Sequence, residues 1–112
     1  MQAEGVSTAT LHTLNDASFE AELRAATRPT LVCFLAPSDV VSEIWLQEVE
    51  SRFSGRLRVI LSPLSESPVA AMRHGVVLTP AYMMFEAGKK RGLAVGAMNP
   101  DDLTRFVNRV LN

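Results

Sequence analysis

The feature that most constrains the fold is an apolar run at Thr30–Leu35, which holds two β-branched residues and no charge. An uninterrupted run of this length indicates a strand buried on both faces, because a half-buried strand would alternate apolar and polar residues. Leu57–Leu61 predicts a second buried strand, followed by a polar loop at Ser62–Ser67. Strands of this kind need helices on both sides of their sheet, so the rest of the chain must supply two helical layers.

The first predicted helix carries Phe19 and Leu23 on one face. Asn15 or Asp16 can cap its N-terminus, because a short polar side chain there accepts hydrogen bonds from unpaired backbone N–H groups. Pro29 must end the helix, since the residue before a proline is disfavoured in the helical conformation.

The second predicted helix follows Thr30–Leu35, with Ser38 or Asp39 as its cap. We expect this helix to end at Ser54-Gly55, because helices commonly end at a residue that tolerates the left-handed conformation. Its apolar residues recur at helical spacing as Val41, Trp45 and Val49, and as Leu46, Val49 and Phe53.

The second half of the chain predicts a short helix at Pro68–Arg73, then a hairpin of Ala81–Phe85 and Lys90–Val95. Asn99 caps the last helix, and Pro100 takes its first position. Its apolar stripe is Leu103, Phe106, Val107, Val110 and Leu111. Together these elements predict an α/β fold with a central mixed sheet and helices on both faces.

The chain of 112 residues predicts one domain over residues 8–112, with an edge strand at Thr8–Leu14 and a flexible lead at residues 1–7. The net charge of −1 supplies no basic field for nucleic acid. The apolar runs are too short to span a membrane, and the first ten residues lack the features of a secretory signal. These observations favour the cytoplasm, although an exported chain trimmed of its signal would have a similar composition.

The order of elements resembles the thioredoxin family over roughly residues 8–111, and several local strings carry the resemblance. His74-Gly-Val-Val-Leu-Thr-Pro80 matches the family's G-[IV]-x-x-x-P. Tyr82–Phe85 with Gly88 matches the strand and turn that follow it, and Val95-Gly-Ala97 matches the V-G-A before the last helix. The resemblance implies a thioredoxin-like fold and a cis peptide bond between Thr79 and Pro80.

The family's W-C-G-P-C redox motif is absent, because the chain continues after Pro37 as Ser38-Asp-Val-Val-Ser-Glu43. One alignment with the family deletes the redox loop, and the other puts Asp39 and Ser42 in the positions of the two cysteines. Thiol–disulfide exchange needs an attacking thiolate and a second sulfur, and this chain has one cysteine. The resemblance also places Cys33 where the family has a buried acid and Leu61 where it has the facing lysine. All three changes are consistent with a loss of redox chemistry.

The function predicted from the sequence is a redox-inactive thioredoxin-fold protein that acts as an interaction, accessory or chaperone-like module. Its partner would be an unidentified protein or peptide, and we expect no cofactor, metal, nucleic acid or membrane. The oligomeric state stays open. The resemblance implies a partner-binding surface at Pro37, Ser38, Asp39, Val40, Leu78, Thr79, Pro80, Gly96, Ala97 and Met98.

The alternative is an enzyme that uses Cys33, such as a monothiol oxidoreductase or a thiol peroxidase. Reactive cysteines commonly lie at helix N-termini, whereas Cys33 falls inside a predicted strand and is more simply explained as a core thiol. His12 and His74 have no ligand or base partner at a suitable spacing. Ser38 and Ser42 lack the motif and partner histidine of a hydrolase.

Overall fold

A computed structural model describes residues 11–111 and shows a mixed sheet between two layers of helices. The predicted lead at residues 1–7 and the start of the predicted Thr8–Leu14 strand lie outside the described residues. The elements in chain order are β2 (His12–Thr13), α1 (Phe19–Ala25), β3 (Thr30–Leu35), α2 (Val40–Phe53), β4 (Arg58–Pro63), α3 (Pro68–Arg73), β5 (Ala81–Glu86), β6 (Lys89–Val95) and α4 (Pro100–Leu111).

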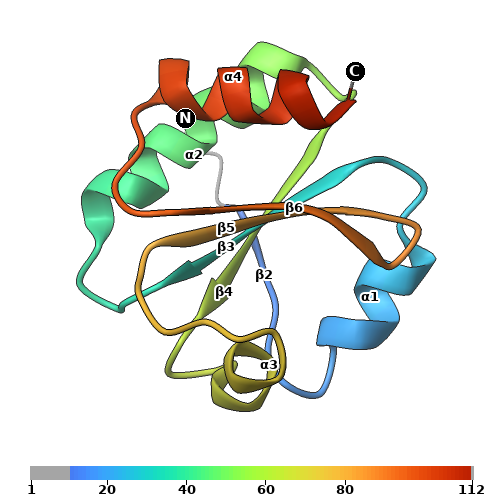
Figure 1. Cartoon of the computed structure of the whole chain (residues 1–112), viewed down its shortest axis with the longest axis vertical. Helices are drawn as coiled ribbons and strands as arrows, with labels where there is room; N and C mark the ends of the chain where they lie inside the picture. Colours follow the sequence, from blue (N-terminus) through green and yellow to red (C-terminus); the bar gives the residue numbers. More distant parts are fainter. Residues whose placement is uncertain (1–10, 112) are drawn as a thin grey trace, which may run out of the picture.

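The five strands of the described sheet lie in the order β2-β4-β3-β5-β6. The central strand β3 pairs parallel with β4 and antiparallel with β5, and β5 and β6 form an antiparallel hairpin. Figure 1 shows α2 and α4 above the sheet and α1 and α3 below it. The predicted α/β architecture is confirmed.

All six residues of β3 are buried, as the apolar run predicts. Its side chains alternate between two cores. Leu31, Cys33 and Leu35 pack with α2 and α4, while Val32 and Phe34 pack with α1 and α3. The central strand therefore joins both halves of the hydrophobic core.

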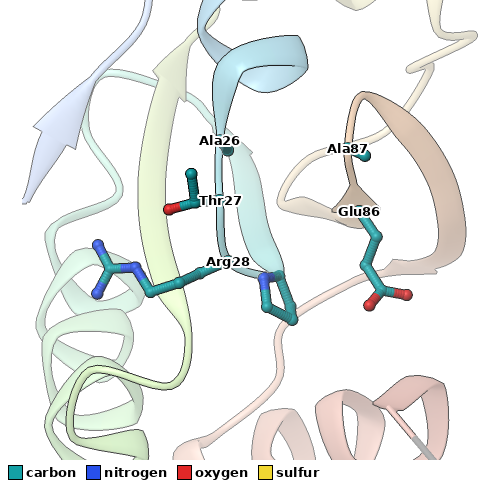
Figure 2. A pocket seen from close by; sticks show the side chains of 6 residues that line it. Ala26, Thr27, Arg28, Glu86 and Ala87 are labelled. Carbon is teal, nitrogen blue, oxygen red and sulfur yellow. The ribbon is translucent and has the colours of Figure 1, made fainter.

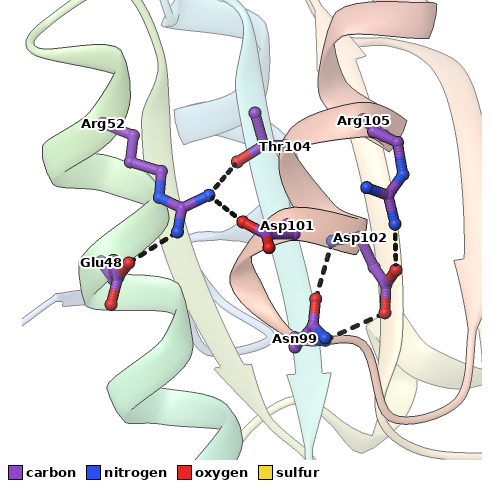
Figure 3. A network of polar contacts seen from close by, with 7 residues as sticks. All are labelled: Glu48, Arg52, Asn99, Asp101, Asp102, Thr104 and Arg105. Carbon is purple, nitrogen blue, oxygen red and sulfur yellow. Dashed lines mark hydrogen bonds and ion pairs between the residues drawn. The ribbon is translucent and has the colours of Figure 1, made fainter.

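Polar contacts between α2 and α4 hold the upper layer together (Figure 3). Arg52 Nη1 donates to Asp101 at 2.8 Å, and Arg52 Nη2 donates to Glu48 at 2.7 Å. Asn99 caps α4 as predicted, because its side-chain oxygen accepts from the Asp102 backbone N–H at 2.8 Å. Asp102 accepts in return from the Asn99 N–H, which completes a reciprocal cap.

The predicted role of Asp16 as a cap of the first helix is wrong. Its carboxylate accepts hydrogen bonds from the backbone N–H groups of Val69 and Ala70, at 3.1 and 2.8 Å, and so caps α3 instead. Asn15 does open the turn that leads into α1, where its side-chain oxygen accepts from the Ser18 N–H. A pattern of neighbouring residues along the chain could not show that Asp16 caps α3 while Asn15 opens the turn into α1.

Two other predictions need correction. The stripe through Val41 and Trp45 is wrong, because Val41 is exposed and α2 buries Ser42 with Leu46, Val49 and Phe53 instead. The second buried strand runs over Arg58–Pro63, so Ser62 and Pro63 belong to the strand rather than to a loop. Ser54 does close α2, in the left-handed conformation with φ of 48°.

No helix in residues 11–111 is long and apolar enough to cross a membrane.

Candidate functional site

The predicted binding surface lies at one end of the sheet, where three connecting segments meet. In Figure 1 the turn from β3 to α2, the segment that enters β5 and the segment that leaves β6 all lie at the left of the molecule. The Gly96 N–H donates to the Pro80 carbonyl at 2.9 Å, which joins the last two segments directly. Ala81 pairs with Phe34 on one side and with Val95 on the other, which brings in the first segment. We call this region the proline end.

The segment that enters β5 contains a cis peptide bond between Thr79 and Pro80, as the family resemblance implies. Leu78 is 65% exposed, whereas Thr79 and Pro80 are half-buried. Gly96 lies beside them with φ of 102°, a conformation that a residue with a side chain rarely adopts. The backbone conformation therefore favours glycine here, whereas space does not require it, because a Cβ at this position would meet nothing within 4 Å.

The turn from β3 to α2 is the third part of the proline end. Pro37 and Ser38 are exposed, and Asp39 accepts a hydrogen bond from the Ser42 N–H at 3.0 Å. Of the two predicted caps, Ser38 and Asp39, it is therefore Asp39 that caps α2. Val40 follows it and is 61% exposed.

Exposed apolar side chains surround this turn more widely than the sequence predicted. Val41 and Ile44 on α2 and Val77 on the opposite segment are all more than half exposed. The sequence could have indicated these exposed residues, because apolar residues occupy more than one face of α2 and one helix face alone can pack against the sheet. Met98 differs from these residues, since it is half-buried and packs against the core under α2 and α4.

The proline end also has few charges. Asp39 is the only Asp, Glu, Lys or Arg in residues 36–39, 74–80 and 96–99, which are its three connecting segments. Glu43 follows one turn later on α2. An apolar, weakly charged patch of this kind marks a protein interaction site more often than a catalytic one.

Cys33 lies below the proline end and is fully buried. Its neighbours across the sheet are Leu61 on β4 and Tyr82 on β5, which confirms that positions 33 and 61 face each other. Burial raises the pKa of the Cys33 thiol well above its usual value, and the charge of Asp39 adds to this shift. The thiol is therefore protonated and shielded at neutral pH, which agrees with the predicted core role.

Tyr82 is a buried residue of this region that the sequence analysis missed. The pKa of its phenol is raised to about 12, mainly by burial and to a smaller extent by Cys33 and Asp39, while the Ser42 hydroxyl and the Met98 backbone act in the opposite direction. These last two groups border the phenol, yet its oxygen completes no hydrogen bond within the described residues. Tyr82 thus places an unpaired hydroxyl between the start of α2 and the segment that leaves β6.

The two histidines lie outside the proline end. His12 Nε2 contacts Glu22 at 2.7 Å, and His74 Nε2 contacts Glu20 at 3.3 Å. Within residues 11–111 no group of three His, Cys, Asp or Glu side chains could hold a metal ion. Each histidine therefore contacts a carboxylate from a distant part of the sequence, which the spacing along the chain did not predict. Neither of these contacts involves Ser38 or Ser42.

A cavity of about 190 Å³ lies at the other end of the sheet, between residues 26–29 and the β5–β6 turn (Figure 2). It is lined by Ala26, Thr27, Arg28, Pro29, Glu86 and Ala87. The Arg28 side chain points away from it in Figure 2 and donates to the Gly55 carbonyl at 2.9 Å. The cavity holds no nucleophile or metal ligand set, and it is separate from the predicted surface.

Comparisons with known proteins agree with the fold and the resemblance. The chain is 31% identical over 102 residues to the thioredoxin of Acidithiobacillus ferridurans, covering 88% of this chain and 94% of that protein. It is 30% identical over 99 residues to the thioredoxin of Pseudomonas aeruginosa, covering 85% and 91%. Thioredoxin 1 of a Nostoc species is 26% identical over 102 residues, covering 88% and 94%. No protein-family profile matches the chain. The chain belongs to the thioredoxin family.

Proposed function

We propose that this chain is a redox-inactive thioredoxin-fold protein that binds another protein non-covalently, as an accessory, scaffold or chaperone-like subunit. The observation that carries this proposal is the state of its one cysteine. Cys33 is fully buried, and its pKa is raised. Disulfide exchange requires an accessible thiolate and a second sulfur to resolve the mixed disulfide.

The relatives are named thioredoxin, which suggests disulfide exchange. This chain differs at the sulfur atoms that such a reaction requires. The turn that would present a cysteine pair ends instead in Asp39, whose carboxylate caps α2. Cys33 lies in the middle of β3, away from any helix N-terminus that could lower its pKa. These features also argue against monothiol chemistry at Cys33.

The proline end supports the binding role. The Gly96 N–H and the Pro80 carbonyl bond to each other, but the backbone groups of the adjacent Thr79 and Ala97 make no backbone hydrogen bond within the described residues. An extended segment could add to these groups through main-chain hydrogen bonds. Val40, Ile44 and Leu78 supply exposed apolar contacts on either side. Because no covalent step remains, affinity must come from this contact area alone.

Affinity purification from the source cell with matched baits tests this proposal. A Leu78→Asp, Ile44→Asp double variant should lose the partner that the wild-type chain recovers, because both charges would be buried at the interface. A Met72→Asp, Asn108→Asp variant makes the same change in net charge at two exposed positions outside the proline end, and it should retain the partner. Cys33→Ala should also retain it, because no mixed disulfide is involved.

Circular dichroism must show that each bait is folded. Unchanged recovery by the folded Leu78→Asp, Ile44→Asp variant would reject the proline end as the binding surface. Loss of the partner with Cys33→Ala alone would reject the non-covalent mode. The cytoplasmic location expected from the sequence stays a prediction.

A further inference from the structure

The β5–β6 turn lies at the end of the sheet opposite the proline end and carries a local excess of positive charge. Lys89, Lys90 and Arg91 are consecutive and exposed at the start of β6. Arg24 joins them, because Gly88 packs against its backbone. Within residues 11–111 the only acidic side chain in ion-pair range of these four is Glu86, 3.8 Å from Arg91. The whole chain has a net charge of −1, so this excess is local.

These cations lie on a strand that can accept another strand. β6 is last in the sheet order, so its outer edge pairs with no other strand of the described part of the chain. Such an edge presents unpaired N–H and C=O groups as a template for an added strand. We call this region the basic edge.

The two faces of β6 differ. On one face α4 packs so closely that a side chain at Gly92 would collide with Val110. On the other face Leu93 is 52% exposed and Val95 is 47% exposed. An added strand would therefore find apolar contacts along the second half of β6 and positive charges along the first half.

Lysines on an edge strand discourage pairing with neutral or basic strands, which protects a protein from aggregation. The same charges favour a strand that carries carboxylates, so they select a partner as well as excluding others. Nucleic acid is a poorer match, because the chain has a pI of about 6.1 and its exposed edge offers no aromatic side chain for stacking.

We propose that the basic edge binds an extended acidic segment of a partner protein as an added strand. Apolar residues of that segment would contact Leu93 and Val95, and its carboxylates would lie beside Lys89, Lys90 and Arg91. The charged half of this surface lies at the opposite end of the sheet from the proline end, and Val95 is its point of contact with that region, next to Gly96. The inference rests on the outer edge of β6 rather than on the three connecting segments, so it does not depend on the function proposed above.

Peptide binding measured by fluorescence anisotropy tests the inference. The probes are a labelled peptide VTVTEDED and its neutral counterpart VTVTQNQN, each at low and at physiological ionic strength. We expect the acidic peptide to bind about tenfold more tightly than the neutral one, with a difference that shrinks as salt is added. A Lys89→Gln, Lys90→Gln, Arg91→Gln variant should remove this preference.

The matched control is an Arg73→Gln, Arg105→Gln, Arg109→Gln variant, which changes the net charge equally and should keep the preference. Leu78→Asp should also keep it, which separates this site from the proline end. Nuclear magnetic resonance should show slowed amide exchange in residues 93–95 when the acidic peptide binds, because an added strand protects these backbone groups.

Equal affinity for the two peptides would overturn the inference, as would an unchanged preference in the Lys89–Arg91 variant. Binding that leaves the β6 amides unperturbed would also overturn it. Self-association of the chain without peptide, abolished by the Lys89–Arg91 variant, would assign the edge to a second copy and reject the acidic partner.

Discussion

The two ends of the sheet present opposite surfaces on the same scaffold. The proline end is apolar, has Asp39 as the only Asp, Glu, Lys or Arg in its three segments, and lies over the buried Cys33 and Tyr82. The basic edge is the outer edge of β6, which begins with Lys89, Lys90 and Arg91 and pairs with no further strand of the described residues. The difference teaches that one scaffold can present two surfaces of distinct chemistry at opposite ends of its sheet. It also predicts that substitutions at the two ends will have very different effects on stability.

The largest effect should come from Cys33→Asp, below the proline end. The new carboxylate would face Leu61 with no positive partner, so we expect a loss of about 3–5 kcal/mol of unfolding free energy at neutral pH. Burial would raise the pKa of this carboxyl in the folded state. The folded state would then bind more protons than the unfolded state, so the loss should grow as pH rises above about 4.

Urea unfolding at about pH 4 and about pH 7 measures this effect. Cys33→Ala is the control for size, and it should cost less than about 2 kcal/mol with no added pH dependence. A loss with Cys33→Asp no larger than with Cys33→Ala would show that the space below the proline end is polar or hydrated, contrary to its observed burial.

Tyr82→Phe should have a smaller effect of the opposite sign. It removes a buried hydroxyl that completes no hydrogen bond, so the unfolding free energy should rise by about 1 kcal/mol. The pKa of Tyr82 is raised to about 12, so the folded wild-type chain keeps a proton that the unfolded chain loses above about pH 10. Wild-type stability should therefore fall between about pH 10 and about pH 12, and Tyr82→Phe should weaken that fall.

Thermal and urea unfolding of Tyr82→Phe across this pH range make the measurement. Ser62→Ala is a matched variant on β4, because Ser62 also has a buried hydroxyl with no partner. A clear loss of stability in Tyr82→Phe, with none in Ser62→Ala, would show that the phenol does bond to Ser42 or Met98 in solution.

The smallest effect on stability should come from the basic edge. Lys89→Gln with Lys90→Gln changes two exposed side chains that make no ion pair within residues 11–111. We expect a change in unfolding free energy below about 0.5 kcal/mol, measured by urea unfolding. A loss above about 1 kcal/mol would mean that these lysines stabilise the hairpin itself, which would weaken the case for a binding role.

Most of the sheet could be predicted from the sequence because its strands are buried in a recognisable pattern. Thr30–Leu35 is apolar throughout, so its central position and the burial of Cys33 follow from composition alone. The cap at Asn99 was also predictable, because it depends only on its own turn. Predictions of this kind succeed where neighbours along the chain decide the structure.

Other features depend on contacts between distant segments and could not be predicted. Asp16 caps α3, which lies more than fifty residues further along the chain. The apolar side chains of α2 surround the helix, so the pattern alone did not show that Val41 faces solvent. Tyr82 sits in an apolar run, and only the packing of α2 and Met98 around it shows its unpaired hydroxyl. Val41 and Tyr82 belong to the candidate site, which is why the site was less predictable than the fold.

An insulin disulfide reduction assay tests most directly whether this member of the thioredoxin family has lost thiol chemistry. The only cysteine is buried and protonated, so the wild-type chain should reduce insulin no faster than the reductant alone. A Cys33→Ser variant should give the same background rate. Turnover by the wild-type chain that Cys33→Ser abolishes would contradict the redox-inactive function.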